Sequence, residues 1–127
     1  MSIPENYLYT ENHEWVFVEG SEAIVGITKY AQSEMGDIVF VELPEIGTQF
    51  IQFERFAVVE SVKAVSDIYI PLSCTIIEVN ENLYNQPELI NHDPYQEGWI
   101  AKIDISDDEE LSNLMDSVEY YQYFGEV

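Results

Sequence analysis

The sequence predicts a mainly β (β-rich α+β) domain, a sandwich or flattened barrel with a helix at its C-terminal end. Many short segments rich in β-branched and aromatic residues are separated by turn residues, as in all-β domains. Only the chain after residue 105 switches to helical spacing. A length of 127 residues with 46% apolar content suits a single domain over 1–127, in which a helical segment covers about 106–124.

The first elements are a hairpin and a short helix. In the strand predicted over 14–18, Trp15 and Phe17 face one way and Val16 and Val18 the other, so this strand is expected to be buried on both faces. A glycine-containing turn leads into a second strand over 23–27. Thr28 is placed to cap a helix over 29–35, and Gly36 is placed to end it.

The middle of the chain predicts four strands around one long hairpin. A continuous apolar strand over 37–43 is stopped by Pro44, and a weak strand follows over 48–54. Two apolar runs, 56–59 and 68–72, also have strand composition. About six of the residues that separate these two runs are expected to form a hairpin loop.

The remaining strands lie on either side of a polar segment. A strand is predicted over 75–79, followed by a loop over 80–91 with a helical turn near 82–84. The segment 99–105 alternates cleanly. Its inward residues are expected to be Trp99, Ala101, Ile103 and Ile105, and its outward residues Lys102 and Asp104.

The C-terminal segment has helix-start signals. Residues 106–109 have capping-box spacing, with Ser106 as the cap and Glu109 three residues later. Ser117 is expected to cap a last short helix that reaches Tyr123. The apolar residues at helical spacing favour core packing over a partner surface. They are Leu111, Leu114, Met115 and Val118.

Lys63 is expected at the tip of the long hairpin. It lies in the stretch Glu60–Asp67, and it is one of only four basic residues in the chain. A lysine at an exposed turn presents an unencumbered amine that can be acylated, which removes its charge. On spacing alone, the simpler interpretation is a solubilising lysine on a loop.

The charge balance excludes some partners. A net charge of −21 makes nucleic acid and anionic membrane surfaces unsuitable partners. Partners with basic rims would be attracted, although the charge also simply keeps a monomer soluble. No apolar run is long enough to span a bilayer, and the acidic N-terminus resembles neither a signal nor a transit peptide. We therefore expect a cytoplasmic monomer.

Side chains suited to catalysis are scarce. His13 is expected to hold the start of the first strand, and His92 to be solvated in a polar loop. Cys74, the only cysteine, has no disulfide partner, and a nucleophilic pair with a histidine lacks a supporting motif. We find no phosphate-binding loop, zinc-ligand spacing or EF-hand. The chain is not expected to be an enzyme or to hold a metal.

Several motifs together resemble the glycine cleavage system H protein family of lipoyl carriers. They occur in family order, span about residues 7–105, the expected core, and include E-S-V-K-A-V-S-D at Glu60–Asp67. The others are His13–Val16, Gly26–Thr28, Ala31–Gln32, Gly36–Pro44, Glu78–Asn80, Asn91, Asp93–Tyr95 and Gly98–Trp99.

The resemblance implies a specific fold and a modified residue. It implies the lipoyl-domain fold, in which two antiparallel sheets carry the modified lysine on a hairpin tip and short helices pack at the periphery. Lipoic acid would be attached to Lys63 through an amide. Glu60 and Asp67 would help a lipoate-attaching enzyme recognise the hairpin, whereas ordinary turn carboxylates are the alternative. Glu14 and Asp67 would border an acidic cleft that shelters the arm.

The resemblance also implies partners. The lipoyl group would accept an aminomethyl group from the glycine decarboxylase (P protein) and pass it to the aminomethyltransferase (T protein). Dihydrolipoyl dehydrogenase (L protein) would then reoxidise the dithiol. Two alternatives remain open: an H-like carrier that donates its lipoyl group to other lipoyl domains, and an unlipoylated interaction protein with the same fold.

The chain departs from the family pattern at two turns. Phe53 and Cys74 occupy positions that hold glycine in most lipoyl domains. A bulky residue at a positive φ would cost about 1–2 kcal/mol unless the turn changes type. Cys74 is nevertheless expected to be a small buried hydrophobe distant from Lys63, rather than a thiol that exchanges with the dithiolane.

Overall fold

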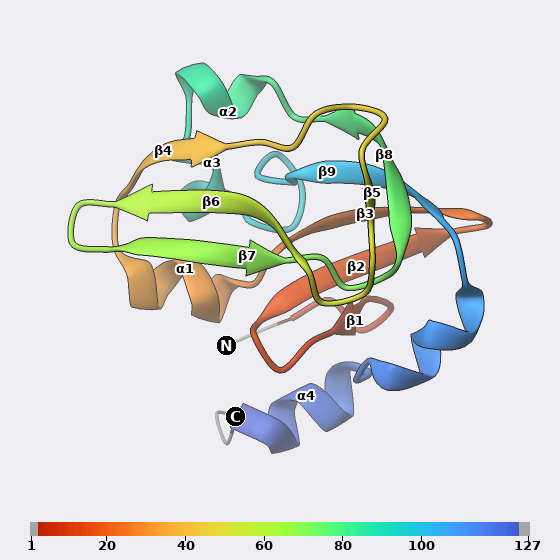
Figure 1. The fold of residues 1–127 in the computed structure, drawn as a ribbon. Helices are drawn as coiled ribbons and strands as arrows, with labels where there is room; N and C mark the ends of the chain where they lie inside the picture. The colour runs from red at the N-terminus through yellow and green to blue at the C-terminus, as the bar shows by residue number, and fades with distance from the viewer. Residues whose placement is uncertain (1–2, 125–127) are drawn as a thin grey trace.

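The computed structural model describes residues 3–124 and consists mainly of two antiparallel sheets, as predicted (Figure 1). Residues 1–2 and 125–127, the ends of the predicted 1–127 domain, lie outside the described residues. The larger sheet contains, in spatial order, β1 (Leu8–Tyr9), β2 (Glu14–Glu19), β3 (Glu22–Ile27), β9 (Ala101–Ile105), β8 (Cys74–Val79) and β5 (Gln49–Phe50). The smaller sheet contains β4 (Ile38–Glu42), β6 (Arg55–Ser61) and β7 (Val65–Tyr69).

Short helices connect and cover the sheets. They are α1 (Lys29–Met35), α2 (Asn82–Asn85), α3 (Leu89–His92), the 3₁₀ helix η1 (Asp108–Asn113) and α4 (Ser117–Phe124). The cap of α1 is the predicted one, since Thr28 Oγ1 accepts a hydrogen bond from the Ala31 N–H at 3.2 Å. Gly36 ends the helix with a φ of 82°. No helix within residues 3–124 is long and apolar enough to cross a bilayer.

The main core lies between the two sheets, because apolar residues from both contribute to one buried cluster. Val41 and Val59 of the smaller sheet and Val25, Ile76 and Ile103 of the larger one are completely buried there. A second, aromatic cluster is formed where α4 packs near β1 and contains Ile3, Tyr9, Trp15 and Tyr120. This second cluster fixes the C-terminal helix to the body of the domain.

Several strand predictions need correction. The weak strand expected over 48–54 is reduced to Gln49–Phe50, and the two-residue strand β1 was missed. The predicted loop over 80–91 contains a second helix, α3, whose N-cap is Glu88, so Pro87 precedes the helix and removes none of its hydrogen bonds. The long hairpin has a turn of only three residues, 62–64, since polar Glu60, Ser61, Ser66 and Asp67 all belong to strands.

The C-terminal predictions were wrong in detail. Asp107, not Ser106, caps η1, and its carboxylate accepts from the Glu109 N–H at 3.0 Å. The chain is extended at Leu114, so no single helix carries the expected apolar stripe. Leu111, Leu114 and Met115 pack with the buried clusters as expected, whereas Val118 is exposed. The cap of α4 is Asp116, because it exchanges two hydrogen bonds with Glu119, each 2.9 Å long.

The two glycine-replacing residues behave differently. Phe53 has a φ of 70°, so the turn keeps the conformation that glycine would favour. Within residues 3–124 the only other non-glycine residue with a positive φ is His13. Cys74 therefore causes no such strain, and the cost expected at its turn does not arise.

Candidate functional site

The turn between β6 and β7 presents Lys63 at the extreme end of the smaller sheet (Figure 1). Ser61 organises this turn: its Oγ accepts hydrogen bonds from the N–H groups of Lys63 at 3.3 Å and Ala64 at 3.1 Å. The Ser61 N–H also donates to the Ala64 carbonyl at 2.8 Å, and the Val62 N–H to the Asp37 carbonyl at 3.0 Å. These bonds fix the turn, so that an exposed lysine stands on an ordered support.

The Lys63 side chain lies close to Gly36, the residue that ends α1. A β-carbon placed on Gly36 would lie 3.6 Å from Cε of Lys63. Asn91 holds Gly36 in position, since its Nδ2 donates to the Gly36 carbonyl at 2.9 Å and its Oδ1 accepts from the Ile38 N–H at 2.9 Å. Within residues 3–124 the two ion pairs join Arg55 to Asp67 and Lys102 to Glu22, so Lys63 is in neither.

A groove begins beside Lys63 and runs between α1 and the exposed edge of β7. It has a volume of about 380 Å³, and the residues that line it include the acidic Glu34 and Asp67 and the aromatic Tyr30 and Tyr69. Apolar side chains form much of its lining: Ile27, Ala31, Met35, Ala64 and Ile68. The lining of the groove thus combines apolar residues with acidic and aromatic ones, which suits a hydrocarbon chain that ends in a cationic group.

Of the predicted acidic residues, Asp67 lines this groove and Glu60 does not. Glu60 is paired with Phe40 on one side and Val65 on the other, whereas its neighbour Val59 faces the core. Glu60 therefore points to the outer face of the smaller sheet. Asp67 also forms a surface ion pair with Arg55 at 3.7 Å, which is too exposed to contribute more than about 1 kcal/mol.

Glu14 is buried directly behind the groove wall. Its side chain is only 2% exposed and does not line the groove. The carboxylate accepts hydrogen bonds from Thr10 Oγ1 and, at 3.2 Å, from the backbone N–H of Tyr69, which does line the groove. Burial raises the pKa of Glu14 to about 7, although these hydrogen bonds act in the opposite direction.

A hydrogen-bonded network that sequence reasoning missed joins the groove to the C-terminal helix. The Tyr120 hydroxyl lies 2.6 Å from His13 Nδ1 and 3.1 Å from Thr28 Oγ1. His13 lines the groove and Thr28 caps α1, the helix that forms one groove wall. The sequence signal was weak, because a tyrosine in a short polar helix has no distinguishing pattern. Burial lowers the pKa of His13 below its ordinary value.

The expected roles of the two histidines and the cysteine are confirmed. The His13 carbonyl accepts from the Thr28 N–H at 3.0 Å next to the start of β2, and His92 is exposed. Cys74 is 1% exposed, and burial raises the pKa of its thiol to about 12. It begins β8, which lies at the opposite end of the sandwich from the Lys63 turn (Figure 1). A thiol in this state is a poor nucleophile.

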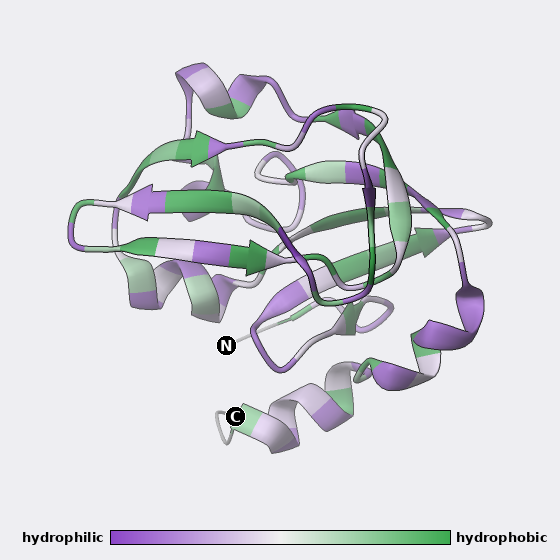
Figure 2. Cartoon of the chain, viewed as in Figure 1, coloured by the Kyte–Doolittle hydropathy of each residue, from purple (hydrophilic) through white to green (hydrophobic). Residues whose placement is uncertain are grey.

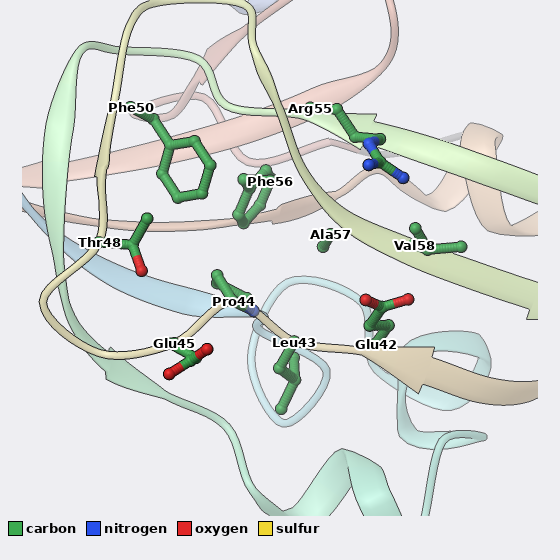
Figure 3. A pocket seen from close by; sticks show the side chains of 10 residues that line it. All are labelled: Glu42, Leu43, Pro44, Glu45, Thr48, Phe50, Arg55, Phe56, Ala57 and Val58. Atoms are coloured by element: carbon green, nitrogen blue, oxygen red, sulfur yellow. The ribbon is translucent and has the colours of Figure 1, made fainter.

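A second hollow lies between the end of β4, the segment before β6 and the beginning of β6 (Figure 3). It has a volume of about 270 Å³. Phe50 and Phe56 lie at one side, with ring centroids 6.3 Å apart, and the Glu42 carboxylate lies at another (Figure 3). It is remote from the turn that presents Lys63. Among residues 3–124 no cluster of three or more His, Cys, Asp or Glu side chains is arranged to bind a metal.

Comparisons with known proteins point to one family. The model of the family described as "Glycine cleavage H-protein" matches residues 7–127. A glycine cleavage system H protein of Halothermothrix orenii is 56% identical over 127 residues, which are 100% of this chain and 99% of that protein. One from Symbiobacterium thermophilum is 54% identical and covers 94% of this chain and 93% of its own length. A crystal structure of a glycine cleavage system H protein from Mycobacterium marinum superimposes with a TM-score of 0.85 at 36% identity, covering 97% of this chain and 99% of that one.

Proposed function

Because the chain belongs to the glycine cleavage H-protein family, we propose that it is the lipoyl-bearing shuttle of the glycine cleavage system. It is a carrier and not an enzyme. It takes an aminomethyl group from the glycine decarboxylase to the aminomethyltransferase, and dihydrolipoyl dehydrogenase reoxidises it. The proposal includes the monomeric state and the cytoplasmic location expected from the sequence.

The observation that supports the proposal best is the exposed Lys63 on its ordered three-residue turn. An amine that is acylated by another enzyme must be reachable, and a turn held by hydrogen bonds presents it with little loss of entropy. The neighbouring groove fits an acyl chain, because its floor is apolar and one end lies beside Ala64. When bound, the lipoyl group supplies a dithiolane that accepts the cargo on sulfur and exchanges electrons as a dithiol.

The residues around the groove have distinct roles in this proposal. Asp67 and Glu34, which are among the lining residues, attract the protonated amine of the cargo. Glu14 acts from behind the wall, where it fixes the Tyr69 backbone and adds negative potential when it is ionised. The apolar floor excludes water from the labile carbon–sulfur linkage. Glu60 and Asp67, on either side of Lys63, are proposed to help the lipoate-attaching enzyme recognise the hairpin.

The test is the intact mass of the protein purified from its own host, followed by peptide mapping. We expect the mass of one lipoyl group, located on Lys63. A chain that carries no lipoyl group, or carries it on another lysine, would contradict the proposed attachment. A lipoylated chain that gives its lipoyl group to a second lipoyl domain and does not support glycine cleavage would instead be a donor.

A further inference from the structure

Apolar side chains are concentrated around Lys63 at the surface. Val62 and Val65 flank the lysine and are 69% and 67% exposed. Val39 and Phe40 on the adjacent strand β4 are 52% and 45% exposed. We call these four residues the hairpin collar. Figure 2 shows apolar (green) segments both on β4 and at the β6–β7 turn. Exposed apolar side chains gathered in one place commonly mark a binding surface.

An irregularity in the sheet exposes two adjacent residues of the collar at once. The pairing of β4 with β6 shifts between Ile38 and Phe40, so Val39 is an extra residue at a β-bulge. Regular alternation would have turned one of the two neighbours inward. The predicted apolar strand over 37–43 is therefore confirmed as a strand, but two of its apolar side chains, Val39 and Phe40, are exposed near Lys63.

Acidic residues lie among and beside the collar residues on the same face. Phe40, Glu60 and Val65 lie in one row across β4, β6 and β7, so their side chains share the outer face. The next row on this face pairs Glu42 and Asp67 with Val58. In the first row the Glu60 carboxylate thus lies between two exposed apolar side chains, and the second row carries two further carboxylates.

We infer that the hairpin collar is the docking surface for the enzyme that acylates Lys63, and that this enzyme presents an apolar surface with lysine or arginine side chains placed opposite Glu60, Glu42 and Asp67. The inference rests on the proposed function. The acylating enzyme must bring an activated lipoyl carboxyl to Nζ itself, so its active-site surface covers the residues next to Lys63. Later partners act at the far end of the arm and need not touch them.

The acylation step explains why a tight collar is useful. The Lys63 ammonium loses a proton to solvent, and its nitrogen attacks the carbonyl carbon of an activated lipoyl donor. The bond from that carbon to its leaving group breaks, an amide bond forms, and the second proton departs with the leaving group. Apolar contacts around the turn would hold the amine at the donor without using the amine itself for binding.

Two isosteric substitutions test the inference. The double variant Val39→Thr/Val65→Thr keeps β-branched side chains of nearly the same shape, and replaces one exposed methyl group by a hydroxyl at each position. The matched control is Val118→Thr, since Val118 is 62% exposed but lies on α4. Each unlipoylated protein is offered at varied concentration to a purified lipoate–protein ligase with lipoate and ATP. Melting temperatures are recorded in parallel.

The collar should affect recognition and not chemistry. We expect the KM for the double variant to rise about tenfold with kcat within about twofold, because two methyl groups are lost from an apolar contact. Val118→Thr should match the unmutated protein, and added salt should raise KM for all three proteins, since the contacts with the three carboxylates are ionic. If the double variant melts more than a few degrees lower than the unmutated protein, the single variant Val65→Thr is used instead, and its KM is expected to rise about threefold.

The outcomes separate the inference from the proposed function. Failure of the ligase to modify even the unmutated protein would contradict the proposed function. Efficient modification of the unmutated protein with an unchanged KM for the double variant would overturn the docking surface alone. It would be overturned equally if Val118→Thr caused the same loss, or if the collar proved to join two copies of the chain in solution.

Discussion

At the scale of single residues, Phe53 and Glu14 are in energetically unfavourable environments: Phe53 because of its backbone conformation, and Glu14 because its carboxyl group is buried. Phe53 has a φ of 70°, and its N–H donates to the Ile70 carbonyl at 2.7 Å, which holds the turn in that geometry. Glu14 is a carboxyl in an almost completely buried position. Both residues can be altered without touching Lys63, so each provides an independent test of the structure.

Substitution of Phe53 by glycine should give a more stable protein than substitution by alanine. Both variants lose the phenyl ring, but only glycine relieves the positive φ. We expect Phe53→Gly to exceed Phe53→Ala by about 1 kcal/mol in free energy of unfolding, measured by urea denaturation. In a strand or helix the order would be reversed, so equal stabilities or the reverse order would mean that this turn has another conformation.

Glu14 should make stability depend on pH. Its folded-state pKa of about 7 lies above the ordinary value of 4.5, so the folded protein binds the proton more tightly than the unfolded chain does. The stability that the neutral carboxyl contributes is complete below about pH 4.5 and is lost as the pH rises towards about 7. The protein should thus lose about 2 kcal/mol through Glu14 between pH 5 and pH 8.

The comparison with Glu14→Gln isolates this contribution from the other carboxylates. The amide does not titrate, so the unmutated protein should become less stable relative to the variant by that amount as the pH rises. Urea denaturation of both proteins at several pH values measures it. A difference that stays constant from pH 5 to pH 8 would show that Glu14 does not have a raised pKa.

At the scale of elements, the groove depends on α1, β7 and α4 together. Tyr120 of α4 reaches both the cap of α1 and His13 at the groove, and it stacks on Tyr9 with ring centroids 4.6 Å apart. Such links join residues far apart in the sequence, and no local pattern predicts them. The cap of α1 was predictable because Thr28 directly precedes the helical segment and Gly36 directly follows it in the chain. The caps of η1 and α4 were misassigned because each has several candidate caps close together.

Removal of the Tyr120 hydroxyl should destabilise the domain. Tyr120→Phe keeps the ring stack but leaves His13 and Thr28 without their shared partner, and we expect a loss of about 1–2 kcal/mol. Tyr123→Phe is the matched control, since that hydroxyl donates to the Glu11 carbonyl from an exposed position and should matter by less than about 0.5 kcal/mol. Thermal unfolding of both variants measures the difference. Equal losses of stability in the two variants would mean that the buried network contributes no more than an exposed hydrogen bond does.

At the scale of the whole molecule, the fold class and the position of Lys63 were accessible from sequence. The turn signals, the strand composition and the ordered motifs all agreed on one architecture. The burial of Glu14, the outward turn of Glu60 and the bulge at Val39 were not accessible, because each depends on strand register across the sheet. The net charge of −21 belongs to this scale too, and it favours partners with basic surfaces.

The most direct measurement is glycine-dependent release of carbon dioxide in a mixture with the decarboxylase, aminomethyltransferase and dihydrolipoyl dehydrogenase. Lys63→Arg should preserve the fold, with a change of at most ~0.5 kcal/mol, because the residue is exposed. Its guanidinium is not a nucleophile and cannot be acylated. Lys29→Arg, at another exposed lysine, is the control. After incubation with the lipoate-attaching enzyme, the unmutated protein and Lys29→Arg should support sustained turnover, and Lys63→Arg should support none. Full turnover with Lys63→Arg, or with protein that has never been lipoylated, would contradict the carrier mechanism.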